Sequence, residues 1–218
     1  MKEYVDQGGS LLFLSNEGGE VSHNTNINYL LEEYGIMINT DAVTRTVYYK
    51  SYFHPKEALV SNGITNREIL RLAGKKIDEE QSSSSISMMK NSAADPIPGT
   101  TGNLSEAVKT GLTFLYPYGA TLNVQKPGIV ILSSGSISYP LQRPVAAAYQ
   151  GTASSKYGGG MIRGAGKVMV LGSCEMFGDS YFDREENTLL WDSLLKYLTI
   201  SGTILNAVDA EDPEVNMY

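Results

Sequence analysis

The 218-residue sequence contains one cysteine, Cys174, and only two histidines, His23 and His54. A single cysteine excludes an internal disulfide and a thiolate-rich zinc site. With so few histidines, a transition-metal site would have to be built mostly from carboxylates. We therefore expect no metal ion and no other cofactor.

Long apolar runs are also missing. No stretch approaches the roughly 18 consecutive apolar residues that cross a bilayer. Residues 1–6 lack the apolar core of a signal peptide. We therefore expect no membrane insertion, and a location in the cytosol or in a compartment continuous with it.

Positive charge is scarce as well. The 17 Lys and Arg residues are outnumbered by 24 Asp and Glu residues, which gives a formal net charge of −7. The cations are scattered and form no basic stripe. Binding to nucleic acid or to an acidic membrane surface is disfavoured, because both require a basic face that neutralises phosphate. Protein partners are left open.

The rest of the composition is typical of a packed soluble domain, with 42% apolar and 19% charged residues. Buried strand-like runs at 11–14 and 167–172 alternate with helix patterns. This alternation favours an α/β fold with a mainly parallel sheet flanked by helices on both faces. Shorter strand-like runs add an antiparallel portion in the middle of the chain. Strands are expected at 36–38, 43–49, 112–116, 121–124, 128–132 and 145–149.

Helices are marked by apolar residues spaced three and four apart. One such stripe covers 27–34 and is followed by Gly35, a residue that commonly ends helices. A second stripe at 191–198 predicts the final helix. Thr65 and Glu68 have the spacing of a capping box at the start of a short helix.

Residues 1–207 are expected to form one α/β scaffold domain. The chain opens on helix-like residues 2–7, which leaves two alternatives open: an amino-terminal unit is missing here, or this protein is shorter than related ones. Residues 75–111 are rich in serine and proline and are expected to form a flexible insertion. Residues 208–218 are expected to form an acidic tail that leads to carboxyl-terminal regions beyond this chain.

Cys174 occupies the position most suggestive of catalysis. A cysteine directly after a buried strand is where an α/β enzyme presents a strained, activated nucleophile. Such a turn needs a small residue two places later, where this sequence has Met176, and a histidine base within reach. His23 and His54 lie in loop-like sequence far upstream. We favour the alternative, a buried structural cysteine.

An acidic cluster surrounds the start of the final helix, at Asp179, Asp183, Glu185 and Glu186. It could bind a cation or act as a catalytic pair. Helix capping explains it without a ligand, since carboxylates are stabilised at helix N-termini. The glycines of 17–19 lack the spacing of a phosphate-binding loop and are expected to form a turn. No residue is assigned to catalysis, a cofactor or a metal.

Aromatic residues gather in one short stretch of the chain. The candidate interaction residues there are Arg45, Tyr48, Tyr49, Tyr52 and Phe53. Tyrosine and arginine are favoured anchors of protein interfaces, so this stretch could be a docking surface. A half-buried strand with aromatic cross-strand pairs would explain the same residues without a partner. Both interpretations stay open.

Several long stretches together resemble the intraflagellar transport protein 52 family. They are 24–36, 52–60, 66–69, 170–177, 183–187 and 209–214. The resemblance covers nearly the whole chain, and it matches the amino-terminal domain that this family shares with bacterial gliding proteins. Family members carry an additional amino-terminal unit ahead of the segment that corresponds to Met1. The insertion at 75–111 is longer than the resemblance would lead us to expect.

The resemblance implies a fold similar to class I glutamine amidotransferases, without catalysis. It implies a scaffold subunit of the intraflagellar transport B complex, needed for cilium assembly, located at the cilium and its base, with other B subunits as partners. An alternative is a small-molecule, carbohydrate-type binding module with its site near 16–19 and 172–174, at the carboxyl ends of strands. A third interpretation is a cysteine hydrolase or amidotransferase that uses Cys174.

Overall fold

The computed structural model describes residues 1–75, 111–151, 166–200 and 202–205. Apart from Lys75 and Gly111, the insertion predicted at 75–111 lies outside these ranges. The acidic tail predicted at 208–218 lies outside them as well.

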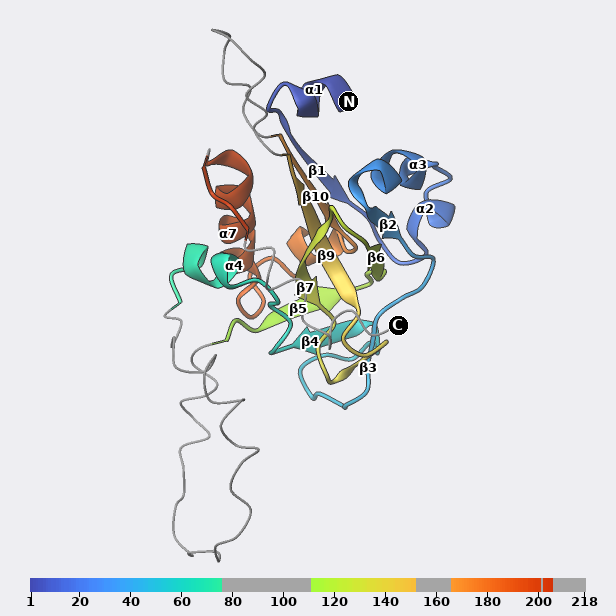
Figure 1. The fold of residues 1–218 in the computed structure, drawn as a ribbon. Coiled ribbons are helices and arrows are strands. Elements are labelled where there is room, and N and C mark those ends of the chain that lie inside the picture. The colour runs from blue at the N-terminus through green and yellow to red at the C-terminus, as the bar shows by residue number, and fades with distance from the viewer. Residues whose placement is uncertain (76–110, 152–165, 201, 206–218) are drawn as a thin grey trace, which may run out of the picture.

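The described chain contains both helices and strands, and its strands mostly follow one another without a helix between them (Figure 1). The α-helices are α1 (Lys2–Asp6), α2 (Gly19–Ser22), α3 (Ile27–Leu31), α4 (Arg67–Leu72) and α7 (Asn187–Thr199), and the 3-10 helices are η1 (Glu32–Tyr34) and η2 (Glu175–Phe177). The strands are β1 (Ser10–Leu14), β2 (Ile36–Ile38), β3 (Thr44–Arg45), β4 (Glu57–Val60), β5 (Phe114–Pro117), β6 (Leu122–Val124), β7 (Ile129–Ser133), β8 (Ser138–Tyr139), β9 (Pro144–Gln150) and β10 (Lys167–Leu171).

The central sheet has the strand order β1-β10-β9-β7 and is mixed. β1 and β10 run parallel, whereas β10–β9 and β7–β9 are antiparallel. Three two-stranded antiparallel sheets, β2–β6, β3–β8 and β4–β5, surround it. The expectation of a mainly parallel sheet was wrong: β1–β10 is the single parallel pair among the described strands. The predicted α/β class was correct.

The error in strand direction has a physical cause. Continuous apolar runs indicate a strand covered on both faces, and parallel sheets are the commonest case of such burial. Here β9 runs antiparallel to both of its neighbours, yet the sheet is still covered on both faces. All five residues of β10 are buried.

Successive residues of β10 point to opposite faces of the sheet, as the period of two requires. Met169 and Leu171 belong to a core cluster that includes residues of α4, β4, β5 and α7. Val168 and Val170 belong to a second cluster with residues of α3, β2 and β6. Figure 1 shows α4 and α7 on one side of the sheet, and α2, α3, β2 and β6 on the other.

The helix predicted over 27–34 is α3 continued by η1, and Gly35 ends it with a left-handed φ of 73°. α4 begins differently from the prediction. Its N-cap is Asn66, whose side-chain oxygen accepts a hydrogen bond from the Glu68 N–H, so Thr65 is not the cap.

The strand predicted over 43–49 is present only as the two residues of β3. Beyond β3 the chain folds back, because the Arg45 guanidinium donates hydrogen bonds to the carbonyl oxygens of Tyr52 (2.5 Å) and Phe53 (3.2 Å). Bulky β-favouring residues therefore occupy a loop here. None of the described helices is both long and apolar enough to span a bilayer.

Candidate functional site

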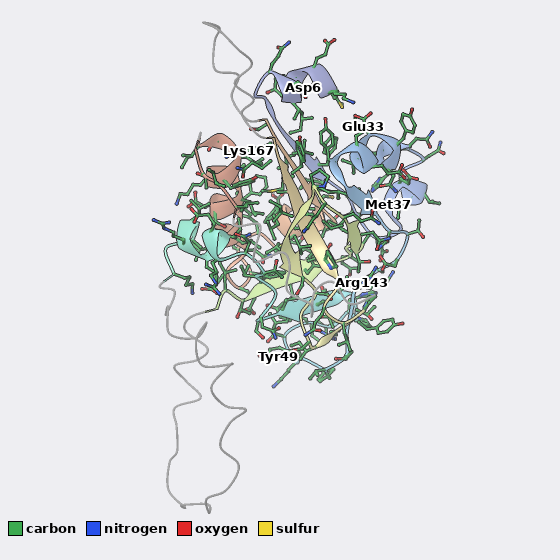
Figure 2. The ribbon with its side chains drawn as sticks, viewed as in Figure 1. Asp6, Glu33, Met37, Tyr49, Arg143 and Lys167 are labelled. Carbon is green, nitrogen blue, oxygen red and sulfur yellow. The ribbon has the colours of Figure 1, made fainter. Side chains whose placement is uncertain are left out.

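Large apolar side chains are exposed together on the loop after β3 and around β8. We call this surface the aromatic face, and its members are Val47, Tyr48, Tyr49, Phe53, Ile137, Tyr139 and Leu141. Phe53 is 86% exposed, Tyr48 74% and Tyr139 65%. Figure 1 shows β3 at the end of the molecule opposite α1, and Figure 2 places Tyr49 at that same end, far from Asp6.

Backbone pairing brings the two segments of the aromatic face together. β3 and β8 are antiparallel, with Thr44 opposite Tyr139. The Thr46 N–H donates a hydrogen bond to the carbonyl oxygen of Ile137 at 3.1 Å, and its hydroxyl donates to the same oxygen at 2.8 Å. Residues about ninety positions apart in the chain therefore form one surface.

Two of the predicted interaction residues hold the loop rather than line its surface. Arg45 bonds to two loop carbonyls, and its Cζ lies 5.8 Å from the centre of the Tyr48 ring. Tyr52 is buried, and its hydroxyl donates to Glu185 Oε1 at 2.5 Å. Burial, and then the hydrogen bond to Glu185, raise the pKa of Tyr52 well above its usual value. Tyr49 stacks on Tyr52 with 6.2 Å between ring centres.

The other three predicted residues, Tyr48, Tyr49 and Phe53, are exposed. Sequence reasoning missed Ile137, Tyr139 and Leu141. Their short stretch has an apolar residue at every second position, which is a strand signal. Its partner strand could not be identified without the fold, because the contact is non-local.

Cys174 lies just beyond the carboxyl ends of the parallel strands β1 and β10. Its backbone N–H donates to the Ser15 carbonyl oxygen at 2.6 Å and to Asn16 Oδ1 at 3.1 Å. Its φ of −82° is an ordinary helical value, whereas a nucleophile elbow holds its residue in a strained conformation. The thiol is half-buried.

The surroundings of Cys174 do not activate its thiol. Burial and the Glu175 charge raise the pKa of the thiol, and a hydrogen bond with Asn16 only partly opposes them. His54 is engaged by other groups: its Nδ1 accepts the Lys56 N–H at 3.1 Å, and its ring packs at a tilt against the Tyr118 ring with 5.1 Å between ring centres. Within the described residues no histidine bonds to Cys174.

A shallow cavity of about 430 Å³ opens beside Cys174. It is lined by Asn16, Glu17, Tyr118, Glu175, Ser180 and Tyr181. Lys56 Nζ lies 2.5 Å from Glu17 Oε2, and the rings of Tyr118 and Tyr181 are 6.4 Å apart. The cavity thus combines aromatic walls with polar and acidic groups.

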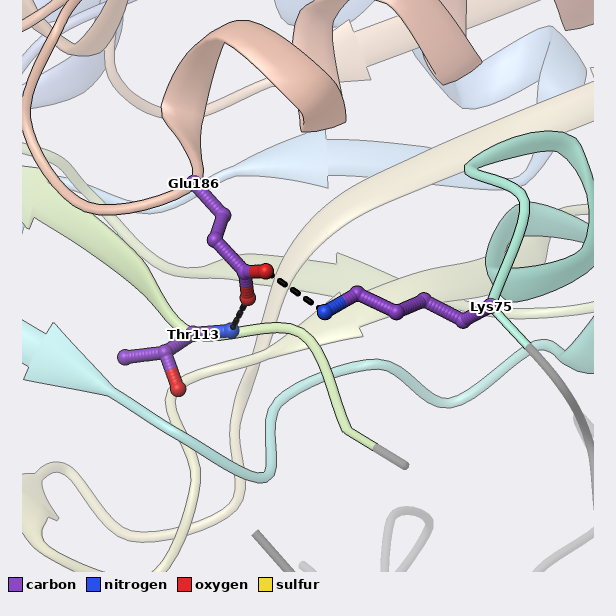
Figure 3. A network of polar contacts seen from close by, with 3 residues as sticks. All are labelled: Lys75, Thr113 and Glu186. Atoms are coloured by element: carbon purple, nitrogen blue, oxygen red, sulfur yellow. Dashed lines mark hydrogen bonds and ion pairs between the residues drawn. The ribbon is translucent and has the colours of Figure 1, made fainter. Parts of the chain in front are cut away.

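The acidic residues before α7 do not converge on one point. Glu186 pairs with Lys75 Nζ at 2.6 Å and accepts the Thr113 N–H at 2.7 Å, as Figure 3 shows. Glu185 accepts from Tyr52. In the described part of the chain, His, Cys, Asp and Glu side chains nowhere gather in threes that could hold a metal ion.

Gly18 lies in the turn expected here, and Gly19 begins α2. Their φ values are 75° and 54°, a region that favours glycine. A Cβ on Gly19 would lie 2.4 Å from the Asn39 carbonyl oxygen. Backbone geometry and close packing therefore account for this glycine pair.

Comparisons with known proteins place this geometry in a family context. The family model for the IFT52 GIFT domain matches residues 1–211. A Mus musculus protein named intraflagellar transport protein 52 homolog is 50% identical over 222 residues, covering 100% of this chain and 44% of the relative. The Homo sapiens homolog is 49% identical, covering 100% of this chain and 43% of the relative. The chain thus spans less than half the length of these curated relatives.

A solved structure shares the fold. The mmIFT52 N-terminal domain matches with a TM-score of 0.66 and 45% sequence identity, covering 92% of this chain and 69% of that one. The mixed α/β architecture described above is therefore the architecture of that domain.

Proposed function

The chain belongs to the IFT52 GIFT domain family, and from this premise we propose that it is a non-catalytic scaffold domain of the intraflagellar transport B complex. It contributes to the assembly of cilia and flagella through protein–protein contacts. Its partners are other B subunits, with no role for nucleic acid or membrane insertion. It acts at the cilium and the ciliary base, on the cytoplasmic side.

The aromatic face is the observation that carries this proposal. Phe53 and Tyr48 are mostly exposed, although burying a large aromatic side chain is favourable by about 1.5–3 kcal/mol. Exposed apolar side chains gathered in one region, as the pairing of β3 with β8 gathers them here, commonly mark an interaction site. Aromatic residues often supply most of the binding energy. A partner that covers the face would recover this energy.

The non-catalytic part of the proposal is supported by Cys174. Family resemblance suggests a fold related to class I glutamine amidotransferases, in which a cysteine after a strand is the nucleophile. Here that cysteine has an unstrained backbone, a raised thiol pKa and no histidine partner within the described residues. We also propose that residues 1–207 act as one scaffold domain, with 75–111 as an insertion and 208–218 as the start of a tail.

Co-purification from ciliated cells tests the proposal. The tagged chain is used as bait, and the tag alone is the control. Enrichment of intraflagellar transport subunits with the chain, but not with the tag, is the expected result. The scaffold proposal would be overturned if the folded chain recovered none of these subunits.

A second candidate function is the binding of a small polar ligand of carbohydrate type. The cavity next to Cys174 favours it, because tyrosine rings and acidic and amide side chains suit the faces and hydroxyls of a sugar. The test is thermal unfolding with a panel of monosaccharides and oligosaccharides. A shift of the wild-type chain that is lost in Tyr118→Ala would support this function, and no shift across the panel would count against it.

A further inference from the structure

The two segments that form the aromatic face carry an unusual charge for this chain. Residues 42–56 and 134–143 contain four Lys or Arg residues and no Asp or Glu. The rest of the chain holds the other 13 cations and all 24 carboxylates. Three carboxylates from outside these segments contact the loop: Glu17 pairs with Lys56, Glu57 accepts the His54 N–H, and Glu185 accepts the Tyr52 hydroxyl. Four cations therefore meet three carboxylates here, which leaves a small positive excess on a chain whose net charge is −7.

The four cations differ in how they are engaged. Lys56 pairs with Glu17, and Arg143 donates to Asn123 Oδ1 at 2.6 Å. Arg45 donates to two carbonyl oxygens of its own loop and lies over the Tyr48 ring, and none of these contacts carries a negative charge. Lys50 is exposed beside Tyr49. Among the described residues no carboxylate forms an ion pair with Arg45 or Lys50.

We propose that the aromatic face binds an acidic segment of a protein partner that carries at least one large apolar side chain. This inference rests on the proposed scaffold function and names the chemistry of the partner. The apolar side chain packs against Phe53, Tyr48 and Tyr139. The acidic residues of the partner lie next to Lys50 and Arg45.

Charge complementarity explains why such a partner would select this face. An acidic segment is disfavoured by the net charge of −7 of the chain and is attracted to Arg45 and Lys50 beside the exposed aromatic side chains, which favours docking there. Burial of the aromatic side chains provides the affinity for the partner. The charges determine where the partner docks and increase its rate of association. A basic segment would instead be drawn to the many carboxylates elsewhere.

A protein segment fits these observations better than a nucleic acid. Single-stranded nucleic acid also combines stacking on aromatics with cationic contacts, but its phosphates need a groove of several cations. Two of the four cations here are already engaged by other side chains. The acidic remainder of the chain would repel the phosphates that extend beyond the face.

Site-specific photocrosslinking tests the inference. The photoreactive residue p-benzoylphenylalanine replaces Phe53 in the chain expressed in ciliated cells, and mass spectrometry identifies the crosslinked segment. The matched control carries the same group at Tyr29, which is 84% exposed on α3, on the other side of the central sheet from α7 and away from β3. We expect position 53 to capture transport subunits through a segment rich in Asp and Glu that contains an aromatic or large aliphatic residue.

Charge reversal then tests the role of Lys50. A synthetic peptide of the captured segment is titrated into the chain by fluorescence anisotropy. Lys50→Glu is expected to weaken binding by about three- to tenfold, because it replaces attraction with repulsion at the edge of the face. Lys2→Glu, on α1 at the other end of the molecule, is expected to change binding by less than about twofold. An oligo(rU) 12-mer serves as the nucleic-acid probe.

The outcomes separate the inference from the scaffold proposal. Capture of transport subunits through a basic or uncharged segment would overturn the acidic partner and leave the scaffold in place. Capture of no transport subunit at position 53 beyond that at position 29 would overturn docking at this face. Tighter binding of oligo(rU) than of the captured peptide would overturn the choice of a protein partner.

Discussion

At the scale of single residues, one buried amide joins three parts of the chain. Asn187, fully buried at the start of α7, accepts the Leu115 N–H at 2.9 Å. Its Nδ2 donates to the carbonyl oxygens of Leu115, Met176 and Tyr181 at 3.0–3.2 Å. This side chain therefore ties β5, η2 and the loop before α7 together. Nothing in the sequence distinguished it from a residue at an ordinary helix start.

Asn187→Ala is expected to lower the free energy of unfolding by about 2–4 kcal/mol. The change removes the partner of the buried Leu115 N–H and of the Leu115 and Met176 carbonyl oxygens, whereas the Tyr181 carbonyl oxygen keeps the Arg184 N–H. Buried polar groups without a partner are costly. Urea unfolding followed by circular dichroism measures the loss. The control is Asn62→Ala, which removes an exposed hydrogen bond to Ser136 and should cost less than about 0.5 kcal/mol. Equal effects of the two variants would contradict the role assigned to Asn187.

The Cys174 thiol should react slowly with iodoacetamide at pH 8. Its pKa is raised by burial and by Glu175, so the thiolate is less populated than in a free cysteine. The rate should increase as pH rises through this elevated pKa. The measurement compares the folded chain with the chain in 8 M urea, where alkylation should be faster. Faster alkylation in the folded state would reopen the interpretation of Cys174 as a nucleophile.

At the scale of helices and strands, sequence patterns predicted correctly the features that depend on a few neighbouring residues. The stripe that ends at Gly35 gave the correct helix, because spacing and a left-handed stop are properties of a few neighbouring residues. The strand prediction over 43–49 was wrong beyond β3, because Arg45 bonds to carbonyl oxygens seven and eight residues away and the chain folds back. The prediction of a mainly parallel sheet was also wrong, because the direction of a strand depends on how distant parts of the chain are connected.

Gly35→Ala and Gly74→Ala form a matched pair at this scale. Both glycines follow helices and have nearly equal left-handed φ values of 73° and 74°. A Cβ on Gly35 would lie 2.2 Å from the Gln125 carbonyl oxygen, whereas a Cβ on Gly74 meets nothing within 4 Å. We expect a cost of about 1 kcal/mol for Gly74→Ala from the conformation alone.

The Gly35 substitution should lower the free energy of unfolding by at least about 2 kcal/mol, because the backbone at Gln125, next to the end of the β2–β6 pair, must shift as well. Thermal and urea unfolding of the two variants compare them directly. If Gly74→Ala proved as destabilising as Gly35→Ala, the close approach at Gln125 would not be the cause.

At the scale of the whole molecule, the sheet is covered on both faces and tyrosines are buried in its cores. Tyr116 and Tyr197 are fully buried in the cluster on the α7 side. Burial raises the pKa of both phenols above the usual value near 10. The stability that the neutral phenols contribute is therefore fully present below pH ~10 and is lost as pH rises further.

Alkaline pH should consequently destabilise the fold. Each buried tyrosine removes up to about 1.4 kcal/mol per pH unit above pH ~10. Lys167 acts in the opposite direction, because burial lowers its pKa, but its effect ends near the usual lysine value of about 10.4. Urea midpoints from pH 8 to pH 11 measure the net fall. Tyr197→Phe should reduce its slope, and midpoints that stayed constant would contradict the account.

Only part of the aromatic face could be predicted from the sequence. Tyr48, Tyr49 and Phe53 were predicted from composition within one short stretch, and they are exposed. Tyr52 was grouped with them, but a hydrogen bond to Glu185, 133 positions away, keeps it buried. Tyr139 was missed because only the pairing of β3 with β8 brings it to this surface.

The central claim is that this face docks the domain into a transport complex. The most direct test is co-purification from ciliated cells with the double variant Phe53→Ser/Tyr139→Ser as bait. The wild-type chain and Tyr29→Ser, which removes an equally exposed aromatic residue elsewhere, are the controls. The melting temperature shows whether the double variant is folded. The account predicts that this variant recovers at least about tenfold less of the transport subunits than the wild-type chain, while Tyr29→Ser recovers as much as the wild-type chain. Unchanged recovery with the double variant would contradict it.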